Sequence, residues 1–372
     1  MADTEDVECW ASMADAFDFG DVDHALRETS VLIPVPTLDT PAAELDSLDT
    51  LATRFACDFR SKLPCVTRRA AAVWMSGSRL GRGGGEAVFG STGCASSNIP
   101  VVLLEKSIDG KTFLGRGSTC HRREGVAARD AWVRVTQRPE NPSQVNTERC
   151  YFRAPLGPEL WSDIDFRPVR AIFGDGEKRM RFPDETGGPP PLPFSEKTSS
   201  VWVSSPGCVT PTHFDLCHGL LTQIRGIKRV LLVPPEHTRS MHRVAPGSVN
   251  PNSSPVDLSL YVFGVHDTEN VSPKSKTKNQ ARLCAARDER VKHPKTANAF
   301  GEIRETTLEP GDTLYIPPFW WHHVVTEEEE NEEDKEEANE SFESKKNQVS
   351  VSLLLAFDPV GDEGVHPCVE ES

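Results

Sequence analysis

The residues best suited to do chemistry stand in the short segment Thr-Pro-Thr-His-Phe-Asp, which covers positions 210–215. His213 and Asp215 are separated there by one residue, and a long apolar run follows them. If the segment is extended, both side chains point to the same face, because side chains alternate along a strand. An imidazole and a carboxylate that converge in this way can hold a divalent metal. An isolated His-x-Asp pair is nevertheless a weak signal, since such short patterns recur by chance and often only cap a turn.

A third ligand for such a metal is available about a hundred residues later, in the segment Glu-Pro-Gly-Asp-Thr-Leu-Tyr-Ile-Pro-Pro-Phe-Trp-Trp-His-His. The segment predicts a tight turn and then a short strand, and it ends on His322 and His323. Adjacent residues of a strand face opposite sides, so only one of these histidines can join His213 and Asp215. The result would be two histidines and one carboxylate, the ligand set of non-haem Fe(II) oxygenases. We expect the other histidine to lie at the surface or to be hydrogen-bonded.

Three separated segments resemble the JmjC family, and more closely its small cupin-8 branch of protein hydroxylases. They are residues 210–215, the paired strands expected over 223–235, and residues 309–324. Their order is similar to that in the asparaginyl hydroxylase that acts on hypoxia-inducible factor. The resemblance covers about residues 95–360 and implies a double-stranded β-helix, a jelly-roll barrel of the cupin type. It also implies Fe(II) as the metal, 2-oxoglutarate as the co-substrate and O2 as the oxidant.

The resemblance assigns specific residues to the metal and to the co-substrate. His213, Asp215 and His322 would be the iron ligands, which leaves the neighbouring histidine pointing out of the barrel, and no further catalytic side chain is implied. Lys228 would bind the distal carboxylate of 2-oxoglutarate, and Thr210 would donate a hydrogen bond to the same group.

The residues around Lys228 support its role independently. Lys228, Val230 and Leu232 would share one face of their strand. A lysine on an apolar, inward face needs an anion, and a dicarboxylate co-substrate would supply one. The alternatives are a solvent-facing lysine at the end of a hairpin and, for Thr210, an ordinary turn position before Pro211.

The sequence departs from the family pattern at the co-substrate pocket. Gly219 stands where the asparaginyl hydroxylase carries an asparagine that helps to hold 2-oxoglutarate, and Ser352 replaces a similarly placed asparagine on a late strand. The tyrosine that completes this pocket has no clear counterpart, and Tyr151 is our candidate ahead of Tyr261 and Tyr315. We therefore expect the co-substrate to be held differently, with Ser352 and Tyr151 as further contacts.

Apolar periodicity and turn residues predict the elements that position these residues. Residues 1–94 predict a mainly helical region, with one helix expected over 39–59 and a flexible loop over the glycine-rich stretch 76–93. Residues 95–360 predict a mainly β domain with flanking helices, because short apolar runs alternate there with turns. Residues 361–372 would be a C-terminal tail.

This β domain also contains two further expected strands and two charged inserts. Residues 131–137 (Ala-Trp-Val-Arg-Val-Thr-Gln) and 258–265 (Leu-Ser-Leu-Tyr-Val-Phe-Gly-Val) both predict strands. A basic insert covers 274–295, and an acidic insert covers 327–347. We interpret both inserts as surface loops, the acidic one as a solvated, disordered run. The alternative is that the basic insert binds an acidic polypeptide or nucleic acid.

Charge and composition favour an intracellular protein that binds nucleic acid poorly. The net charge is −15, of which residues 327–343 contribute −10, so the rest of the chain is close to balanced and poorly suited to nucleic acid. No apolar stretch is long enough to span a membrane, and the acidic N-terminus lacks the pattern of a secretory signal. The ten cysteines include no Cys-x-x-Cys pair, which favours reduced thiols. Nucleus and cytosol are not distinguished.

Together these patterns favour an Fe(II)- and 2-oxoglutarate-dependent dioxygenase that hydroxylates a side chain of a protein or peptide. A lysine demethylase is the first alternative, disfavoured because there is no zinc-binding Cys/His cluster and the acidic ligand is aspartate. An RNA-base hydroxylase is disfavoured by the overall acidity. A catalytically silent binding module with the same fold is disfavoured because such a barrel has no need of an intact metal triad and lysine. The helical N-terminal region would support either dimerisation or capture of the substrate.

Overall fold

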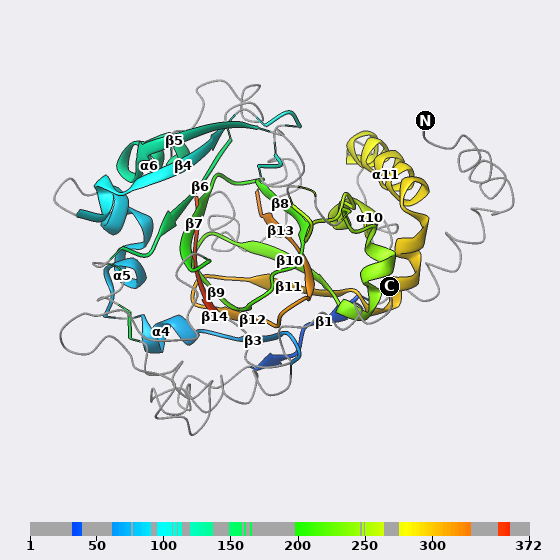
Figure 1. Cartoon of the computed structure of the whole chain (residues 1–372), viewed down its shortest axis with the longest axis horizontal. Helices are drawn as coiled ribbons and strands as arrows, with labels where there is room; N and C mark the ends of the chain where they lie inside the picture. The colour runs from blue at the N-terminus through cyan, green and yellow to red at the C-terminus, as the bar shows by residue number, and fades with distance from the viewer. Residues whose placement is uncertain are drawn as a thin grey trace, which may run out of the picture.

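The computed structural model describes a β-barrel with helices on two sides. The described residues are 32–38, 62–75, 77–90, 95–105, 107–109, 111–113, 120–136, 149–157, 160, 164–165, 198–245, 248, 250–263, 275–328 and 349–357. In this part of the chain the strands form two sheets, one of five strands and one of nine. Figure 1 shows the two sheets facing each other around a common interior.

The barrel is made by eight consecutive strands, β7 to β14. They are β7 (Ser200–Ser204), β8 (Val209–His213), β9 (His218–Arg225), β10 (Lys228–Val233), β11 (Arg304–Leu308), β12 (Thr313–Ile316), β13 (Trp321–Thr326) and β14 (Ser350–Phe357). One sheet contains β11-β10-β13-β8 in that order, and the other contains β12-β9-β14-β7. All their pairings are antiparallel. This is the double-stranded β-helix, or jelly roll, and the predicted fold class is confirmed.

Both sheets are extended by strands from the N-terminal half of the chain. The five-stranded sheet adds β1 (Ile33–Pro34), and the nine-stranded sheet adds β2 (Thr37–Leu38), β3 (Cys65–Thr67), β4 (Pro100–Glu105), β5 (His121–Ala127) and β6 (Cys150–Pro155). The described part of residues 1–94 is therefore not only helical, because three short strands from it pair with the barrel. The helix expected over 39–59 lies outside the described residues.

Two turns that join the barrel strands depend on glycine. Gly226, between β9 and β10, has φ 72°, and Gly311, between β11 and β12, has φ 105°. Residues with a side chain rarely adopt these values, so glycine lets the chain cross from one sheet to the other within two to four residues. The second turn is fastened by Asp312, whose carboxylate accepts hydrogen bonds from Glu309 N (2.9 Å) and Arg68 Nη1 (2.5 Å).

The glycine-rich stretch is helical, contrary to the expected loop. It forms α5 (Arg79–Gly85) and a π-helix, η1 (Glu86–Gly90), after the short helix α4 (Ala70–Trp74). Ser78 caps α5 by accepting a hydrogen bond from Gly81 N. A Cβ atom at Gly81 would lie 2.0 Å from Met75 O, and one at Gly85 would lie 2.1 Å from the Trp132 ring. The glycines thus serve close packing, which composition alone does not reveal.

Two of the predicted strands are helices instead. Residues 131–137 fall largely in α6 (Ala128–Thr136), whose buried residues are Ala128, Ala131, Trp132 and Val135. Their spacing of three and four is that of one helix face, so the alternating apolar residues were misleading. The predicted strand over 258–265 begins with the helix α10 (Leu258–Tyr261), because Asp257 accepts a hydrogen bond from Leu260 N and caps it.

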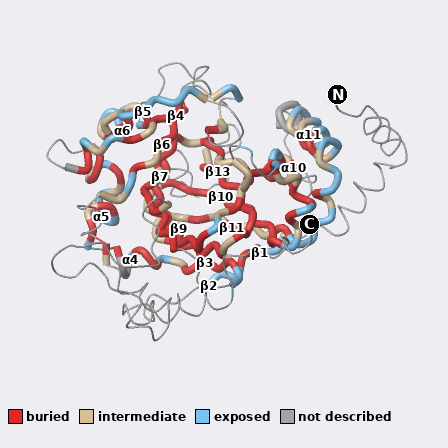
Figure 2. The backbone as a smooth tube through the Cα atoms, viewed as in Figure 1, coloured by how far each residue is buried: buried red, intermediate tan, exposed pale blue. Residues whose placement is uncertain are grey.

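The basic insert over 274–295 is also a helix rather than a loop. It forms α11 (Ser275–Lys292), which packs beside α10 and exposes its outer face (Figures 1 and 2). Helices α4, α5 and α6 lie on the opposite side of the barrel (Figure 1). The acidic insert beyond residue 328 and the C-terminal tail lie outside the described residues. None of the described helices is long and apolar enough to cross a bilayer.

Candidate metal and co-substrate site

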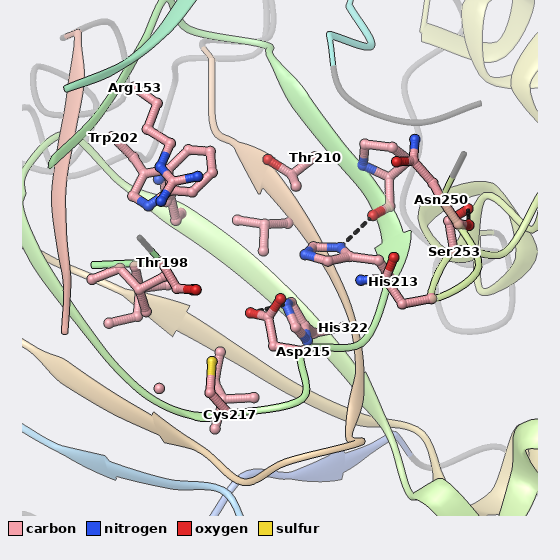
Figure 3. Close-up of a pocket in the computed structure, with 18 of the residues that line it drawn as sticks. Arg153, Thr198, Trp202, Thr210, His213, Asp215, Cys217, Asn250, Ser253 and His322 are labelled. Atoms are coloured by element: carbon pink, nitrogen blue, oxygen red, sulfur yellow. Dashed lines mark hydrogen bonds and ion pairs between the residues drawn. The ribbon is translucent and has the colours of Figure 1, made fainter. Parts of the chain in front are cut away.

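Two neighbouring strands bring the three predicted metal ligands together inside the barrel. His213 ends β8, and His322 stands opposite it on β13 in the strand register. Their imidazole rings lie 4.1 Å apart between centroids. Asp215 follows β8 by two residues, and the ligand atoms of all three residues lie within 4.8 Å of one another (Figure 3). The spacing of the sequence motifs therefore corresponds to one cluster in space.

Hydrogen bonds to the backbone orient both imidazoles toward this cluster. His213 Nδ1 lies 2.8 Å from Pro211 O, and His322 Nδ1 lies 3.0 Å from Trp320 O. A carbonyl oxygen can only accept, so in each ring Nδ1 carries the proton and Nε2 keeps its lone pair. A neutral imidazole fixed by its other nitrogen is the usual arrangement of a metal-binding histidine.

A β-bulge next to His213 aims the first ligand. His322 pairs with His213, but Val324 pairs with Thr210, so Pro211 and Thr212 together oppose a single residue of β13. Bulges bend a strand and redirect side chains, and they tolerate proline, which has no N–H to give to the ladder. The Thr-Pro-Thr-His sequence thus explains the local geometry. Its proline lies in the bulge, and the carbonyl oxygen of that proline accepts a hydrogen bond from the imidazole two residues later.

His323 lies on the outer face of the same sheet, and it is buried and hydrogen-bonded rather than on the surface. It is 1% exposed. Thr212 Oγ1 donates to Val256 O (2.6 Å), so His323 Nδ1 donates to Thr212 Oγ1 (3.1 Å). His323 Nε2 lies 3.6 Å from Asp257 Oδ1. Of the two alternatives for the second histidine, the hydrogen-bonded one holds: its partner is Thr212 of β8, and Asp257 of the segment that leads into α10 lies near its other ring nitrogen.

Asp215 is held from its backbone and reaches the cluster near the surface. Its carbonyl oxygen accepts a hydrogen bond from Phe319 N (2.8 Å), and Phe319 adopts a left-handed φ of 66°. The Asp215 side chain is 31% exposed, and its Oδ2 lies 3.8 Å from His322 Nε2. Burial, followed by the nearby His213, lowers the pKa of His322 to about 4. His322 is therefore neutral near pH 7, which is the form that binds a metal ion.

Lys228 occupies the same cavity as the three ligands. The cavity has a volume of about 420 Å³ and is lined by Lys228, Thr210 and Tyr151 as well as by the cluster. Lys228 begins β10, is 4% exposed, and has no hydrogen-bond or ion-pair partner among the described residues. Burial lowers the pKa of its ammonium group to about 8. A buried cation of this kind is costly unless an anion joins it.

Two hydroxyl groups accompany Lys228. Tyr151 on β6 and Thr210 on β8 lie side by side, with their oxygens 3.3 Å apart. Burial raises the pKa of Tyr151, so it stays a neutral hydroxyl. The cavity thus has a face of two imidazoles and a carboxylate, and a region with one ammonium and two hydroxyl groups. These are suited respectively to a divalent metal and to a carboxylate.

Parts of this sequence are similar to those of known proteins. A family model described as cupin-like domain matches residues 136–353, which is more than half of the chain. The chain belongs to the cupin-like domain family. It is also 31% identical over 120 residues to the Drosophila melanogaster protein named Jumonji C domain-containing protein 5. That alignment covers 32% of this chain and 22% of the relative, so the relationship extends over only a part of each.

One predicted co-substrate contact does not lie at the cavity. Ser352 is fully buried and is not among the residues that line the cavity. Its hydroxyl donates to Gln223 Oε1 (2.6 Å), and Gln223 Nε2 donates to Ser350 Oγ (3.1 Å). The contact of Ser352 with the co-substrate stays a prediction. Gly219, by contrast, does line the cavity, as the family pattern implied.

Arg153 is a charged cavity residue that we did not predict. It lies on β6 two residues after Tyr151, and it lines the cavity together with Trp202 of β7. The signal was present, because residues two apart on a strand share a face, and Tyr151 was already a candidate. The narrower resemblance to the asparaginyl hydroxylase stays a prediction.

Proposed function

We propose that the protein is an Fe(II)- and 2-oxoglutarate-dependent dioxygenase that hydroxylates a side chain of a protein or peptide. The observation that supports this best is that the His213–Asp215–His322 cluster and the buried ammonium group of Lys228 share one cavity. Either group alone has an ordinary structural explanation. A face of three metal ligands beside a pocket for a carboxylate suits an oxygenase with a dicarboxylate co-substrate.

The donor set fits Fe(II) on chemical grounds. Two neutral imidazoles and one carboxylate are ligands of intermediate and hard character, and they approach from one side, so the other positions of the ion are left for co-substrate, oxidant and water. Iron held by His213, Asp215 and His322 would supply the oxidation of a C–H bond by O2, coupled to conversion of 2-oxoglutarate to succinate and CO2. Every other part of the reaction that we assign to this chain is binding, orientation or exclusion of water.

Lys228, Thr210 and Tyr151 would fix the orientation of the co-substrate. The ammonium of Lys228 provides the counter-charge for the distal carboxylate, and the two hydroxyl groups donate hydrogen bonds to it. Apolar side chains of the cavity, among them Leu221 and Leu354, flank this region and limit the water that reaches it. The carbon chain of the dicarboxylate would then extend from Lys228 toward the metal ligands.

The position of Asp215 supports a large substrate rather than a small enclosed one. Its side chain is 31% exposed, and the adjacent Leu216 is 62% exposed. The metal cluster is therefore close to the protein surface, with an apolar side chain beside it. A side chain that projects from a protein or peptide can reach such a cluster without the rest of the substrate entering the barrel.

Two measurements test the proposal. Calorimetric titration of 2-oxoglutarate into Mn(II)-loaded protein should give saturable binding that His213→Ala and Lys228→Met each weaken by about tenfold or more. His237→Ala is the matched control, because His237 pairs with Glu302 outside the cavity. Mass spectrometry of a cell-extract proteome incubated with the Fe(II)-loaded protein should then reveal side chains with one added oxygen. Unchanged 2-oxoglutarate binding in the two cavity variants would refute the proposed function.

A further inference from the structure

Arg153 lines the same cavity as the metal cluster, at a position displaced from the co-substrate region. Tyr151 and Arg153 share one face of β6, and both line the cavity. Tyr151 lies beside Thr210 at the co-substrate region. Arg153 is therefore displaced along the strand from that region by two residues, or roughly 7 Å. Figure 3 shows it across the pocket from the metal cluster, next to Trp202.

The guanidinium group of Arg153 is held in a fixed position. Its Nε donates a hydrogen bond to Ser200 Oγ (2.8 Å). Its central carbon lies 5.2 Å from the centroid of the Trp202 ring, a cation–π contact. Arg153 and Trp202 are also directly paired in the β6–β7 register. Because contacts on two sides already restrict the Arg153 side chain, it would lose less conformational entropy when it binds a ligand. This preorganisation favours tight binding.

The electrostatics of this side of the cavity change when a metal binds. Burial lowers the pKa of Arg153, and the negative charge of Asp215 is the main influence that works against this effect. Asp215 is also the one carboxylate among the described residues that line the cavity. A divalent ion bound by Asp215 would offset this negative charge. The same cavity would then favour an incoming anion more strongly than it does without metal.

We propose that Arg153 forms a carboxylate-binding subsite, so that the substrate presents a carboxylate close to the carbon that is oxidised. The inference rests on the proposed function and narrows its substrate class to acidic groups. A planar guanidinium recognises a carboxylate through two parallel hydrogen bonds, which fixes both position and orientation. An aspartate or glutamate side chain and the C-terminal carboxylate of a peptide are the two sources of such a group.

The co-substrate does not need Arg153. One carboxylate of 2-oxoglutarate is matched by Lys228, Thr210 and Tyr151, and the other end of the molecule belongs at the metal ligands. Both ends are thereby accounted for without the arginine. Arg153 lies on a different strand from Lys228 and beside a different set of side chains, so the two cations are able to act on separate ligands.

A peptide-retention experiment tests this subsite without requiring turnover. Immobilised full-length protein, loaded with Mn(II) and 2-oxoglutarate, is given an equimolar mixture of random peptides with a central Asp, Glu, Asn or Gln. One half of the mixture has a free C-terminus and the other half is amidated. Mass spectrometry counts the retained peptides. The variants are Arg153→Gln, Arg153→Lys and the control Arg129→Gln, which alters an exposed arginine on α6.

We expect the wild type and Arg129→Gln to enrich peptides with the recognised carboxylate over their amide counterparts by about tenfold, the size of one charge-assisted contact. The amide counterpart is Asn or Gln for a side-chain carboxylate, and the amidated C-terminus for a terminal carboxylate. Arg153→Gln should remove this enrichment, and Arg153→Lys should keep a part of it. Enrichment that follows the central residue identifies a side-chain carboxylate, and enrichment that follows the free C-terminus identifies a terminal one. The inference is overturned if the wild type retains carboxylate peptides and both kinds of amide counterpart equally. It is also overturned if Arg153→Gln leaves the enrichment unchanged.

A parallel titration separates this inference from the proposed function. Arg153→Gln should bind 2-oxoglutarate with an affinity within about twofold of the wild type. If it instead weakens 2-oxoglutarate binding as much as Lys228→Met does, Arg153 is a co-substrate residue and the subsite is refuted. If the wild type itself does not bind 2-oxoglutarate, the proposed function fails first. Binding of 2-oxoglutarate without any preference for acidic peptides overturns only the substrate class.

Discussion

His322 and His323 are neighbours on β13 with nearly equal burial, 4% and 1% exposed, yet they lie in opposite surroundings. On the inner face, His322 Nε2 points at a second imidazole and a carboxylate around a space that an ion would fill. On the outer face, His323 Nδ1 donates a hydrogen bond to Thr212 Oγ1, and its Nε2 lies 3.6 Å from Asp257 Oδ1. The same residue type would be a metal ligand on one side of the sheet, and it is a structural residue on the other. Burial alone does not distinguish them, whereas the identity of their partners does.

The sharpest test of this comparison is to remove each histidine separately. His322→Ala should lower the affinity for Mn(II) or Co(II) by at least a hundredfold, because one of three ligands is lost. Its effect on the free energy of unfolding should be below about 1 kcal/mol, since the deleted ring borders an existing cavity. His323→Ala should instead lower the free energy of unfolding by about 2–4 kcal/mol, because it opens a closed void in a packed region.

Calorimetric metal titration and urea unfolding of the metal-free variants give the two values. The comparison fails if both substitutions weaken metal binding equally, or if His322→Ala proves to be the more destabilising of the two.

Lys228 extends the comparison to a group for which the described residues supply no partner. Lys228→Met should weaken 2-oxoglutarate binding by about ten- to a hundredfold, the loss of one charge-assisted contact. Without co-substrate, the same variant should be more stable than the wild type, by about 1–3 kcal/mol, because a buried cation no longer has to be desolvated. Thermal unfolding with and without 2-oxoglutarate would show the two opposite shifts. A loss of stability without ligand would contradict the view that this ammonium awaits an anion.

The pH dependence of co-substrate binding follows from the same group. The pKa of Lys228 is about 8 in the folded protein, against 10.5 for an ordinary lysine. Below pH 8 the ammonium is already formed, so affinity for 2-oxoglutarate should be constant. Above pH 8 binding must take up a proton, and affinity should fall by up to tenfold per pH unit. For folding, the depressed pKa means that the cost of burying the charge is present below pH 8 and is relieved as the pH rises toward 10.5.

Titration at pH 7, 8 and 9 in two buffers of different ionisation enthalpy measures both the affinity and the proton uptake. Lys228→Arg is the matched control, because a guanidinium stays charged throughout this range. It should bind more weakly but show no change between pH 8 and 9. A wild-type affinity that is flat up to pH 9 would mean that another cation holds the co-substrate.

The metal cluster was predictable from sequence because it depends on strand alternation and on short motifs. His213, Asp215 and His322 lie where the motifs indicated, and so do Lys228, Thr210 and Tyr151. Ser352 is different, because the structure places it away from the cavity lining, where its hydroxyl donates to Gln223. A position matched to a family pattern does not tell which neighbouring side chain will bind the hydroxyl group.

The flanking elements were less predictable because tertiary packing determines them. The glycine-rich composition around Gly81 and Gly85 predicted a flexible loop. In the structure these glycines let a helix pack closely against Met75 and Trp132, and such contacts depend on atomic detail that a sequence pattern does not give. Val256, which accepts from the Thr212 partner of His323, and Asp257, which lies beside His323, belong to the segment before α10, whose path no local pattern specified. The mainly β class of the barrel domain, by contrast, could be inferred from dense apolar runs between turn residues, and the resemblance to the JmjC family narrowed it to the double-stranded β-helix.

The smallest expected effect concerns the bulge that joins the two faces of the sheet. Thr212 accepts a hydrogen bond from His323 Nδ1 on the outer face and precedes His213, which points inward. Thr212→Val keeps the shape but removes this hydroxyl, so the bulge should relax and His213 should be aimed less well. We expect the affinity for Co(II) to fall about fivefold, or about 1 kcal/mol, with a shift in the visible absorption bands of the bound Co(II).

Thr212→Ser is the matched control, because it restores the hydroxyl group and should recover both the affinity and the spectrum. A general loss of packing would lower the unfolding midpoint of both variants and leave the Co(II) spectrum of each as in the wild type. That outcome would limit Thr212 to the outer face of the sheet. Recovery by serine alone would instead mean that the outer hydrogen bond orients the inner ligand, and that the two histidines, despite their opposite surroundings, act on the same metal site.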